Sequence, residues 1–363
     1  MLGSMPDDST TRDPASRDDL FLSLTPERVL DAVEAAGLQT NPVCYPLNSF
    51  ENRVYEVELE DRTRIIAKFY RPGRWNAEQI REEHRFLEDL TDEEVPVCPV
   101  RRFPDGTTLK QQGKIYYSLA ERRGGRAPDE LSDDAAERLG MLVGRMHNVG
   151  VRRPAPHRVV MSADTFIRDN LAWLRQHDTV PEHLRERYFA AAEEIAERTD
   201  RLFAEVDPDL HRVHGDLHLG NVLDRDGALN VLDFDDMATG PAVQDLWLSM
   251  PGRDSYAVRQ REAFLEGYER FRLFDRTQLR LIEPLRAMRL VHYATWLARR
   301  WHDPIFPATW TDFGTDAYWE AEVDTLEEQV ALIRAEEDPV AARRAEPEEE
   351  LSNKDYFWDW EED

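Results

Sequence analysis

Apolar residues recur at every second position in the first third of the chain and at helical spacing in most of the remainder. Alternation with period two predicts strands that are buried on one face, and the Asp, Asn and Gly residues between such runs predict turns. Strands are therefore expected at 43–51, 54–58, 64–69, 100–103 and 115–121.

Two helices are expected among these strands. Thr25 is suited to cap a helix whose first turn contains Pro26, and Gly37 follows the end of its apolar stripe. A second helix is predicted at 76–90, where apolar residues again share one face. The first third of the chain is therefore expected to be a small sheet with two helices.

The pattern changes after Gly124 and Gly125, where long helical periods take over. A small β-rich lobe joined by a glycine hinge to a larger helical lobe suggests an α+β, bilobal protein with a ligand bound between the lobes. Helices are expected at 133–149, 162–176, 182–204, 256–271 and 278–301, interrupted by a loop and hairpin at 214–236.

These changes divide the chain into an N-lobe at 20–122 and a C-lobe at 123–335, flanked by two tails. Residues 1–19 are polar and are expected to be a disordered tail. Residues 336–363 are acidic and carry aromatic residues within 356–360, which suggests either disorder or docking on the body of the protein as an autoinhibitor.

Charge and composition exclude several classes of partner. The net charge of −27 argues against nucleic acid or an anionic membrane as a partner. Two separated cysteines, Cys44 and Cys98, give no disulfide framework, and no stretch is long and apolar enough to span a membrane. A soluble, cytoplasmic monomer is therefore expected, and among 42 arginines the four lysines are conspicuous.

The segment 214–236 carries the densest candidate chemistry. It begins HGDLHLGN, continues through a predicted hairpin with a turn at Asp226 and Gly227, and ends DFDD. The hairpin folds Asp233 back beside Asn221, so that two oxygen ligands meet where a hard divalent cation could bind. This spacing is the one that phosphoryl transfer by a kinase requires.

The roles follow from what phosphoryl transfer needs, which is positioning, charge neutralisation and metal ions. Asp216 would orient the acceptor hydroxyl or accept its proton, and orientation is expected to be the larger part because a carboxylate is a weak base at neutral pH. Asn221 and Asp233 would hold Mg²⁺ against the phosphates of ATP.

Lys68 is embedded in an apolar strand, where a buried ammonium needs a counter-charge. Glu83 shares the apolar face of the helix 76–90 and is the expected partner, with Glu82 as the alternative in register. Such a pair would present the lysine to the phosphates of ATP. The competing interpretation is a lysine on an edge strand with its head group in solvent.

The first predicted hairpin lacks the glycines of a typical phosphate-binding loop. Its turn, LNSFEN, contains Ser49, which together with nearby backbone amides could contact phosphate. Asn48 and Asn52 could equally be there only to form the turn.

These residues together resemble the aminoglycoside phosphotransferase/choline kinase-like division of the protein kinase-like fold. Within it, the flanking segments resemble a bacterial serine/threonine protein kinase branch of the stress response. The segments that carry the resemblance are NSFENRVYEVEL, FYRPGRW, EEHRFL, HGDLHLGNVL, DFDDM and WLARRW.

The resemblance implies ATP and Mg²⁺ as cofactors and a protein substrate with a Ser or Thr acceptor. It assigns Asp216 as proton acceptor, Asn221 and Asp233 as metal ligands, and Ser49 as an ATP contact. It places the adenine near Glu121 to Arg123. It also implies that His214, His218 and Asp245 support the catalytic loop.

Only eleven residues separate Asp233 from Asp245, which leaves little room for an activation loop. Peptide docking must therefore differ from that of ordinary protein kinases, or the acceptor is a small molecule such as an amino alcohol, sugar or aminoglycoside. Two remoter hypotheses are a metallohydrolase with His214, Asp216 and His218 as ligands, and a pseudokinase scaffold.

Overall fold

The computed structural model describes residues 21–337, so the predicted tail at 1–19 and nearly all of the acidic tail lie outside it. The described chain divides into two compact units. The first contains residues 21–80 and 100–122, and the second contains residues 81–99 and 123–337. The segment 81–99, which was expected in the N-lobe, is therefore grouped with the second unit.

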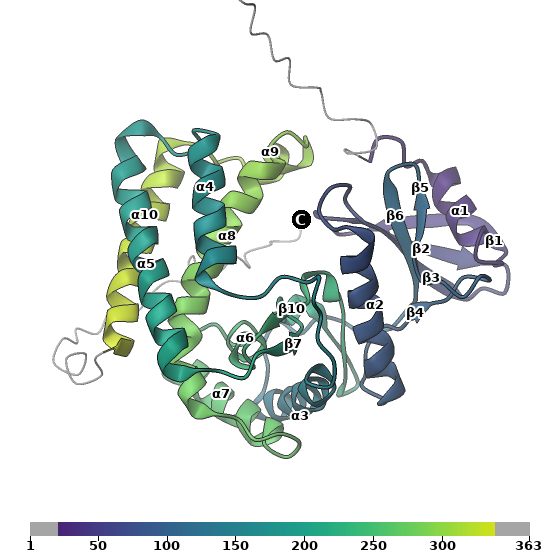
Figure 1. Ribbon diagram of the computed structural model, residues 1–363. Helices are drawn as coiled ribbons and strands as arrows, with labels where there is room; N and C mark the ends of the chain where they lie inside the picture. The colour runs from purple at the N-terminus through teal and green to yellow at the C-terminus, as the bar shows by residue number, and fades with distance from the viewer. Residues whose placement is uncertain (1–20, 338–363) are drawn as a thin grey trace, which may run out of the picture. The chain divides into compact units, whose positions relative to one another are not determined.

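The first unit is built on an antiparallel sheet with the order β1-β2-β3-β6-β4, in which β5 also pairs with β6 (Figure 1). The predicted strands all form, and β5 is an addition. Their bounds are β1 Thr40–Leu47, β2 Arg53–Leu59, β3 Arg64–Phe69, β4 Val100–Arg101, β5 Lys110–Gln112 and β6 Ile115–Glu121.

Helix α1 (Pro26–Glu34) begins as the sequence predicted, with the Thr25 hydroxyl accepting a hydrogen bond from the Arg28 amide. Its apolar stripe is buried against the sheet, where fully buried apolar side chains form the core of this unit. Among them are Val29, Val33, Val57, Ala67 and Phe69.

Strand β3 lies between β2 and β6, so the hypothesis that Lys68 stands on an edge strand is wrong. Lys68 is in register with Val54 on one side and Ser118 on the other. Its side chain is half-buried, and its Nζ lies 4.9 Å from the centre of the Tyr70 ring. The Lys68 side chain thus projects from a central strand of the sheet.

The second unit is mainly helical, and the boundary between the units falls inside α2 (Ala77–Asp92). Two pairs of short strands are the exception, and they carry the segment 211–240. The strands are β7 His211–Val213, β8 Val222–Arg225, β9 Ala228–Val231 and β10 Ala238–Gly240. The helices are α3 Asp133–Gly150, α4 Asp169–Gln176, α5 Arg185–Val206, α6 Val243–Trp247, α7 Ser255–Tyr268, α8 Ile282–Arg300, α9 Ile305–Thr309 and α10 Asp316–Glu337.

Helices α3 and α7 approach each other so closely that glycine is required at the contact. A Cβ on Gly140 would lie 1.9 Å from the carbonyl oxygen of Phe264, and one on Gly267 would lie 1.9 Å from that of Glu137. Any larger residue would force the helices apart. This contact holds the part of α3 that bears His147 against the core of the unit.

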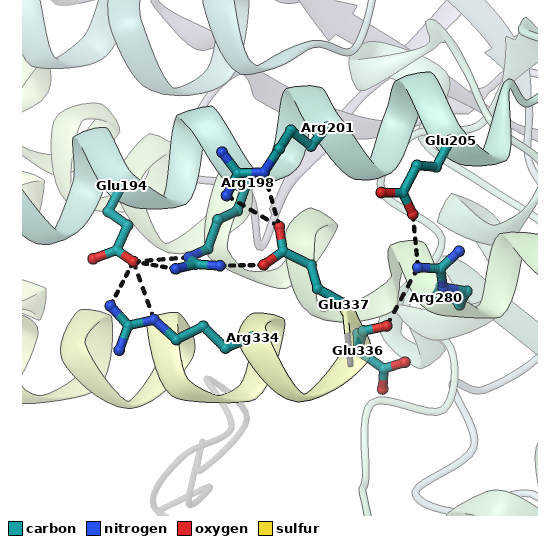
Figure 2. A network of polar contacts seen from close by, with 8 residues as sticks. All are labelled: Glu194, Arg198, Arg201, Glu205, Arg280, Arg334, Glu336 and Glu337. Atoms are coloured by element: carbon teal, nitrogen blue, oxygen red, sulfur yellow. Dashed lines mark hydrogen bonds and ion pairs between the residues drawn. The ribbon is translucent and has the colours of Figure 1, made fainter. Parts of the chain in front are cut away.

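Helix α10 was not predicted, although its buried positions follow a helical period. Trp319, Val323, Leu326, Val330 and Ile333 are buried. Arginines and carboxylates join its C-terminal end to α5 (Figure 2). Glu194 accepts from Arg198 and Arg334, and Glu337 pairs with Arg198 and Arg201.

The described residues therefore form an α+β fold, with an antiparallel sheet in the N-terminal part and helices in the C-terminal part, as the sequence predicted. None of the helices within 21–337 is both long and apolar enough to cross a membrane.

Candidate active site

The loop that follows β7 starts from a buried strand and turns sharply at Gly215. Strand β7 pairs with β10 in antiparallel register, with Val213 opposite Ala238. Gly215 has a φ of +84°, and a Cβ at this position would lie 2.3 Å from the carbonyl oxygen of Asp236. The glycine therefore lets the loop with Asp216 pass directly against the loop of the DFDD segment.

The predicted hairpin forms and brings Asn221 and Asp233 to the same end of two paired strands. Strands β8 and β9 pair from Val222 opposite Val231 onwards. One step beyond that pair, the Leu232 amide donates to the Asn221 carbonyl at 2.9 Å. Asp233 is the next residue, and it adopts a left-handed backbone conformation with a φ of 55°. Such strain in a non-glycine residue is typical of functional sites.

The donor set at this end suits Mg²⁺. The Asn221 amide group donates through Nδ2 to the Asp216 carbonyl at 2.9 Å, which fixes the side chain and leaves Oδ1 as the oxygen able to bind a cation. Mg²⁺ commonly takes one or two protein oxygens and completes its shell with phosphates and water. Asn221 and Asp233 fit that pattern. Asp233 would supply the negative charge.

Asp245 is fully buried beneath the loop and accepts three hydrogen bonds from it and its surroundings. Its Oδ2 accepts from the His214 amide at 2.7 Å, and its Oδ1 accepts from the Gly215 amide at 2.9 Å. The third donor is His147 Nε2, at 3.0 Å from Oδ2. Burial tends to raise the pKa of this carboxyl, but the hydrogen bonds outweigh burial and the net pKa is lowered.

His147 is a supporting residue that the sequence did not reveal. It is fully buried in α3, and its Nδ1 lies 2.9 Å from the hydroxyl oxygen of Tyr268. Two neighbours of Asp245 hold the loop by its carbonyls: Gln244 donates to Gly215 at 2.8 Å, and Ser249 donates to Leu217 at 2.7 Å. The loop is thus held by its amides and carbonyls from α6 and the segment after α6, and His147 of α3 in turn positions Asp245.

His214 uses both of its ring nitrogens inside the protein. Its Nδ1 accepts from the Asp216 amide at 3.2 Å, and its Nε2 donates to the Leu232 carbonyl at 2.7 Å. It is also fully buried. It therefore shapes the loop and has no nitrogen available as a metal ligand, which removes the ligand set of the metallohydrolase hypothesis. No group of three or more His, Cys, Asp or Glu within 21–337 is placed to hold a metal ion.

The carboxylate of Asp216 faces an arginine from a distant helix. Arg289 of α8 donates through Nη1 to Asp216 Oδ1 at 2.7 Å, and His218 Nε2 lies 3.6 Å from Oδ2. Burial tends to raise the pKa of Asp216, but the charge of Arg289 and the neighbouring histidines lower it overall. Burial lowers the pKa of His218 to about 4, so its imidazole is neutral at neutral pH.

A buried arginine, Arg158, fixes the segment with Asp233. Arg158 donates through Nε to the Met237 carbonyl at 2.7 Å and through Nη2 to the Asp235 carbonyl. Glu82 of α2 accepts from the Arg158 amide at 3.1 Å and from the His157 amide at 3.0 Å. Glu82 therefore already accepts hydrogen bonds from the segment with Arg158, which disfavours it as the partner of Lys68.

Glu83 is almost completely buried in α2, on the inward face that the helical period predicted. Nearby on the same helix, Phe86 meets Phe234 edge to face, with 5.7 Å between ring centres. Phe234 in turn lies 4.6 Å from the His214 ring. Lys68 belongs to the first unit and Glu83 to the second, so their pairing stays a prediction.

The turn with Ser49 is shaped by an arginine rather than by glycine. Ser49 is half-buried between β1 and β2. Arg71 donates through Nε to the Glu51 carbonyl at 2.9 Å and through Nη2 to the Phe50 carbonyl at 3.0 Å. The Arg71 amide donates to the Asn52 side chain at 3.1 Å. Three contacts to Arg71 thus stabilise this turn.

The residues expected near adenine lie at the end of the first sheet and just beyond it. Glu121 is the last residue of β6, in register with Ile65. Arg123 follows in the second unit, where its Nε donates to the Val97 carbonyl at 3.4 Å. Both side chains are exposed. A role in nucleotide binding stays a prediction for both.

The chain is similar to known proteins over most of its length. Residues 44–282 match the model of a family described as "Phosphotransferase enzyme family". The chain is 38% identical over 314 residues to stress response kinase A of Escherichia coli (strain K12), covering 86% of this chain and 95% of that protein. It is 38% identical over 319 residues to serine/threonine protein kinase RdoA of Salmonella typhimurium (strain LT2), covering 86% and 94%.

Among solved structures, the chain resembles amicoumacin kinase hAmiN in complex with AMP-PNP, Ca²⁺ and Ami. The TM-score is 0.63 at 20% identity, over 83% of this chain and 92% of that one. At this identity the likeness concerns the fold alone. It confirms the kinase-like fold that the sequence predicted.

Proposed function

The chain belongs to the phosphotransferase enzyme family, and on that premise we propose that it transfers the γ-phosphate of ATP to a serine or threonine hydroxyl of a protein. The observation that carries the proposal is the joint placement of Asp216, Asn221 and Asp233 by the loop after β7 and the β8–β9 hairpin. Little else is needed chemically, because phosphoryl transfer depends on positioning and charge neutralisation.

In this proposal Asp216 orients the acceptor hydroxyl. Its lowered pKa makes it a weak base but keeps it ionised, so it accepts the hydrogen bond of the hydroxyl throughout the neutral range. Asn221 and Asp233 would hold Mg²⁺, which neutralises the phosphate oxygens of ATP as charge develops.

The first unit would supply the remaining contacts to ATP. Lys68, central in its sheet, would reach the phosphates and would be paired with Glu83 of the second unit. The turn with Ser49 would lie over the phosphates, and the adenine would lie near Glu121 and Arg123. These assignments rest on the family resemblance and on the position of each residue in its own unit.

A protein acceptor is favoured over a small molecule because of the relatives. The proteins named stress response kinase A and serine/threonine protein kinase RdoA are 38% identical and are covered over 95% and 94% of their length. The amicoumacin kinase resembles the chain at only 20% identity. Since identity over nearly the whole length includes the acceptor-binding part, the first comparison carries more weight.

The test is an assay with ATP labelled at the γ-phosphate, supplied with Mg²⁺ and a lysate as source of protein acceptors. We expect labelled proteins with the wild type and at least about 1,000-fold less labelling with Asp216→Asn. Asp324→Asn is the matched control, since Asp324 is 73% exposed on α10 and pairs only with surface residues in the described chain. Transfer to a small alcohol without any protein labelling would overturn the protein acceptor.

A further inference from the structure

Arg289 stands beside the oxygen that the proposed reaction uses, and the proposed chemistry does not require a cation there. It comes from α8, 73 residues after Asp216, and makes the 2.7 Å hydrogen bond to Asp216 Oδ1. Its side chain is 29% exposed and that of Asp216 is 22% exposed. Both side chains are therefore exposed enough to contact an acceptor and shielded enough from water to interact strongly with each other.

The hydrogen bond from Arg289 makes the two carboxylate oxygens of Asp216 differ in their surroundings. Oδ1 is engaged by Arg289, whereas Oδ2 lies 3.6 Å from Nε2 of the neutral His218, beyond hydrogen-bond distance. A hydroxyl donor would therefore approach Oδ2. That places the guanidinium on the opposite oxygen of the same carboxylate, where it offsets the attraction that Asp216 alone would exert on a cation and adds a positive group beside the acceptor.

The face of α8 beyond Arg289 is aromatic. Tyr293 lies one helical turn further on, and Trp296 stacks on it with 5.5 Å between ring centres. Trp296 also meets Phe306 and Trp310 of the α9 region at 5.0 and 5.5 Å. Beyond Arg289, the next arginines of α8 are Arg299 and Arg300, near the end of the helix.

We propose that Arg289 is a specificity-determining residue that rejects acceptors with a cationic group next to the reacting hydroxyl and favours those with neutral or acidic neighbours. This inference rests on the proposed function of the same site. Amino alcohols and basic peptides would bring a like charge against the guanidinium, whereas a serine flanked by carboxylates would gain an attraction. The substrate class is therefore a serine or threonine in a neutral or acidic segment.

The test uses the full-length protein and three peptides of equal length, each with one serine flanked on both sides by Glu, Gln or Lys. For the wild type we expect kcat/KM to fall in the order Glu, Gln, Lys, with roughly tenfold between the extremes, the size of one partly screened charge interaction. The preference should weaken as salt is added, because the charges are partly exposed.

Three variants then separate charge from structure. Arg289→Met should bring the three peptides within about twofold of one another, Arg289→Glu should reverse their order, and Arg289→Lys should retain it. A variant that is merely misfolded would lose activity equally on all three. Arg299→Met is the control, because it removes the same charge from α8 about 15 Å further along the helix and should keep the wild-type order.

Two results would overturn the inference: a wild type that is indifferent to peptide charge, or an Arg289→Met variant that keeps the wild-type preference. The failure of the proposed function looks different. If the wild type labels no peptide or protein but phosphorylates a neutral or anionic small alcohol, the acceptor is wrong and the charge selection stands. If it phosphorylates a cationic amino alcohol efficiently, both fail.

Discussion

Asp245→Asn should destabilise the second unit strongly, although it changes almost no volume. The carboxylate accepts three hydrogen bonds, from the amides of His214 and Gly215 and from His147. An asparagine has one oxygen and one NH₂ group. If its oxygen takes the place of Oδ2, the NH₂ group faces the Gly215 amide, and two donors are left without an acceptor.

The magnitude follows from this count. One broken hydrogen bond with buried donors left unsatisfied costs about 1–3 kcal/mol, and the two that remain lose the reinforcement of a charge. The sum is about 3–5 kcal/mol, in the range for breaking a buried charge interaction. For a unit of this size that corresponds to a drop in melting temperature of roughly 6–20 °C.

The assay is thermal unfolding followed by circular dichroism, together with kcat for phosphoryl transfer. Asp324→Asn, an exposed carboxylate paired with Arg187 at 3.1 Å, should shift the free energy of unfolding by less than about 0.5 kcal/mol. A double-mutant cycle between Asp245 and His147 should give a coupling energy of about 1–3 kcal/mol. A melting temperature within about 2 °C of wild type, which corresponds to about 1 kcal/mol or less, together with unchanged kcat would refute the reasoning.

Three further predictions concern single positions. Burial raises the pKa of Glu322 from 4.5 to about 7, so this carboxyl stabilises the fold at low pH and loses that contribution as pH rises through this interval. Glu322→Gln should therefore lack this loss of stability when melting curves are measured at increasing pH. Parallel pH profiles for the two proteins would contradict the prediction. Gly215→Ala should lower the free energy of unfolding by at least roughly 2 kcal/mol more than Gly227→Ala. Both glycines have a φ of +84°, but only a Cβ on Gly215 would lie within 4 Å of other backbone atoms. Equal losses in thermal unfolding would show that this close approach is unimportant. Arg158→Met should lower the melting temperature and kcat together by removing the donor to the Met237 carbonyl, and a change in neither would show that this hydrogen bond does not support the loop.

The local elements of the site were predictable because their signals are short in sequence. The turn at Asp226 and Gly227 fixed the hairpin, and the hairpin fixed which residues stand beside Asn221. The alternation of apolar residues in 64–69 likewise predicted strand β3, which contains Lys68. Helix α10 was missed even though its buried positions follow a helical spacing, because acidic and polar residues between them weaken the contrast between its two faces.

The supports of the site could not be predicted in the same way. His147 lies 98 residues before Asp245, and Arg289 lies 73 residues after Asp216. Neither stands in a motif, and Arg289 is one of 42 arginines. Only the packing of α3 against α7 and the course of α8 bring these side chains to the loop, and such long-range contacts leave no periodic trace in the sequence.

The buried anchorage of the loop after β7 also has a consequence for divergence and redesign. The loop is held by its backbone atoms from α6 and the residue Ser249 that follows α6, so those contacts do not depend on the outward side chains of the loop. By contrast, α8 reaches Asp216 through one guanidinium. A lineage, or a designer, could therefore change the acceptor by substitutions along a single helix while the phosphoryl-transfer apparatus is inherited intact.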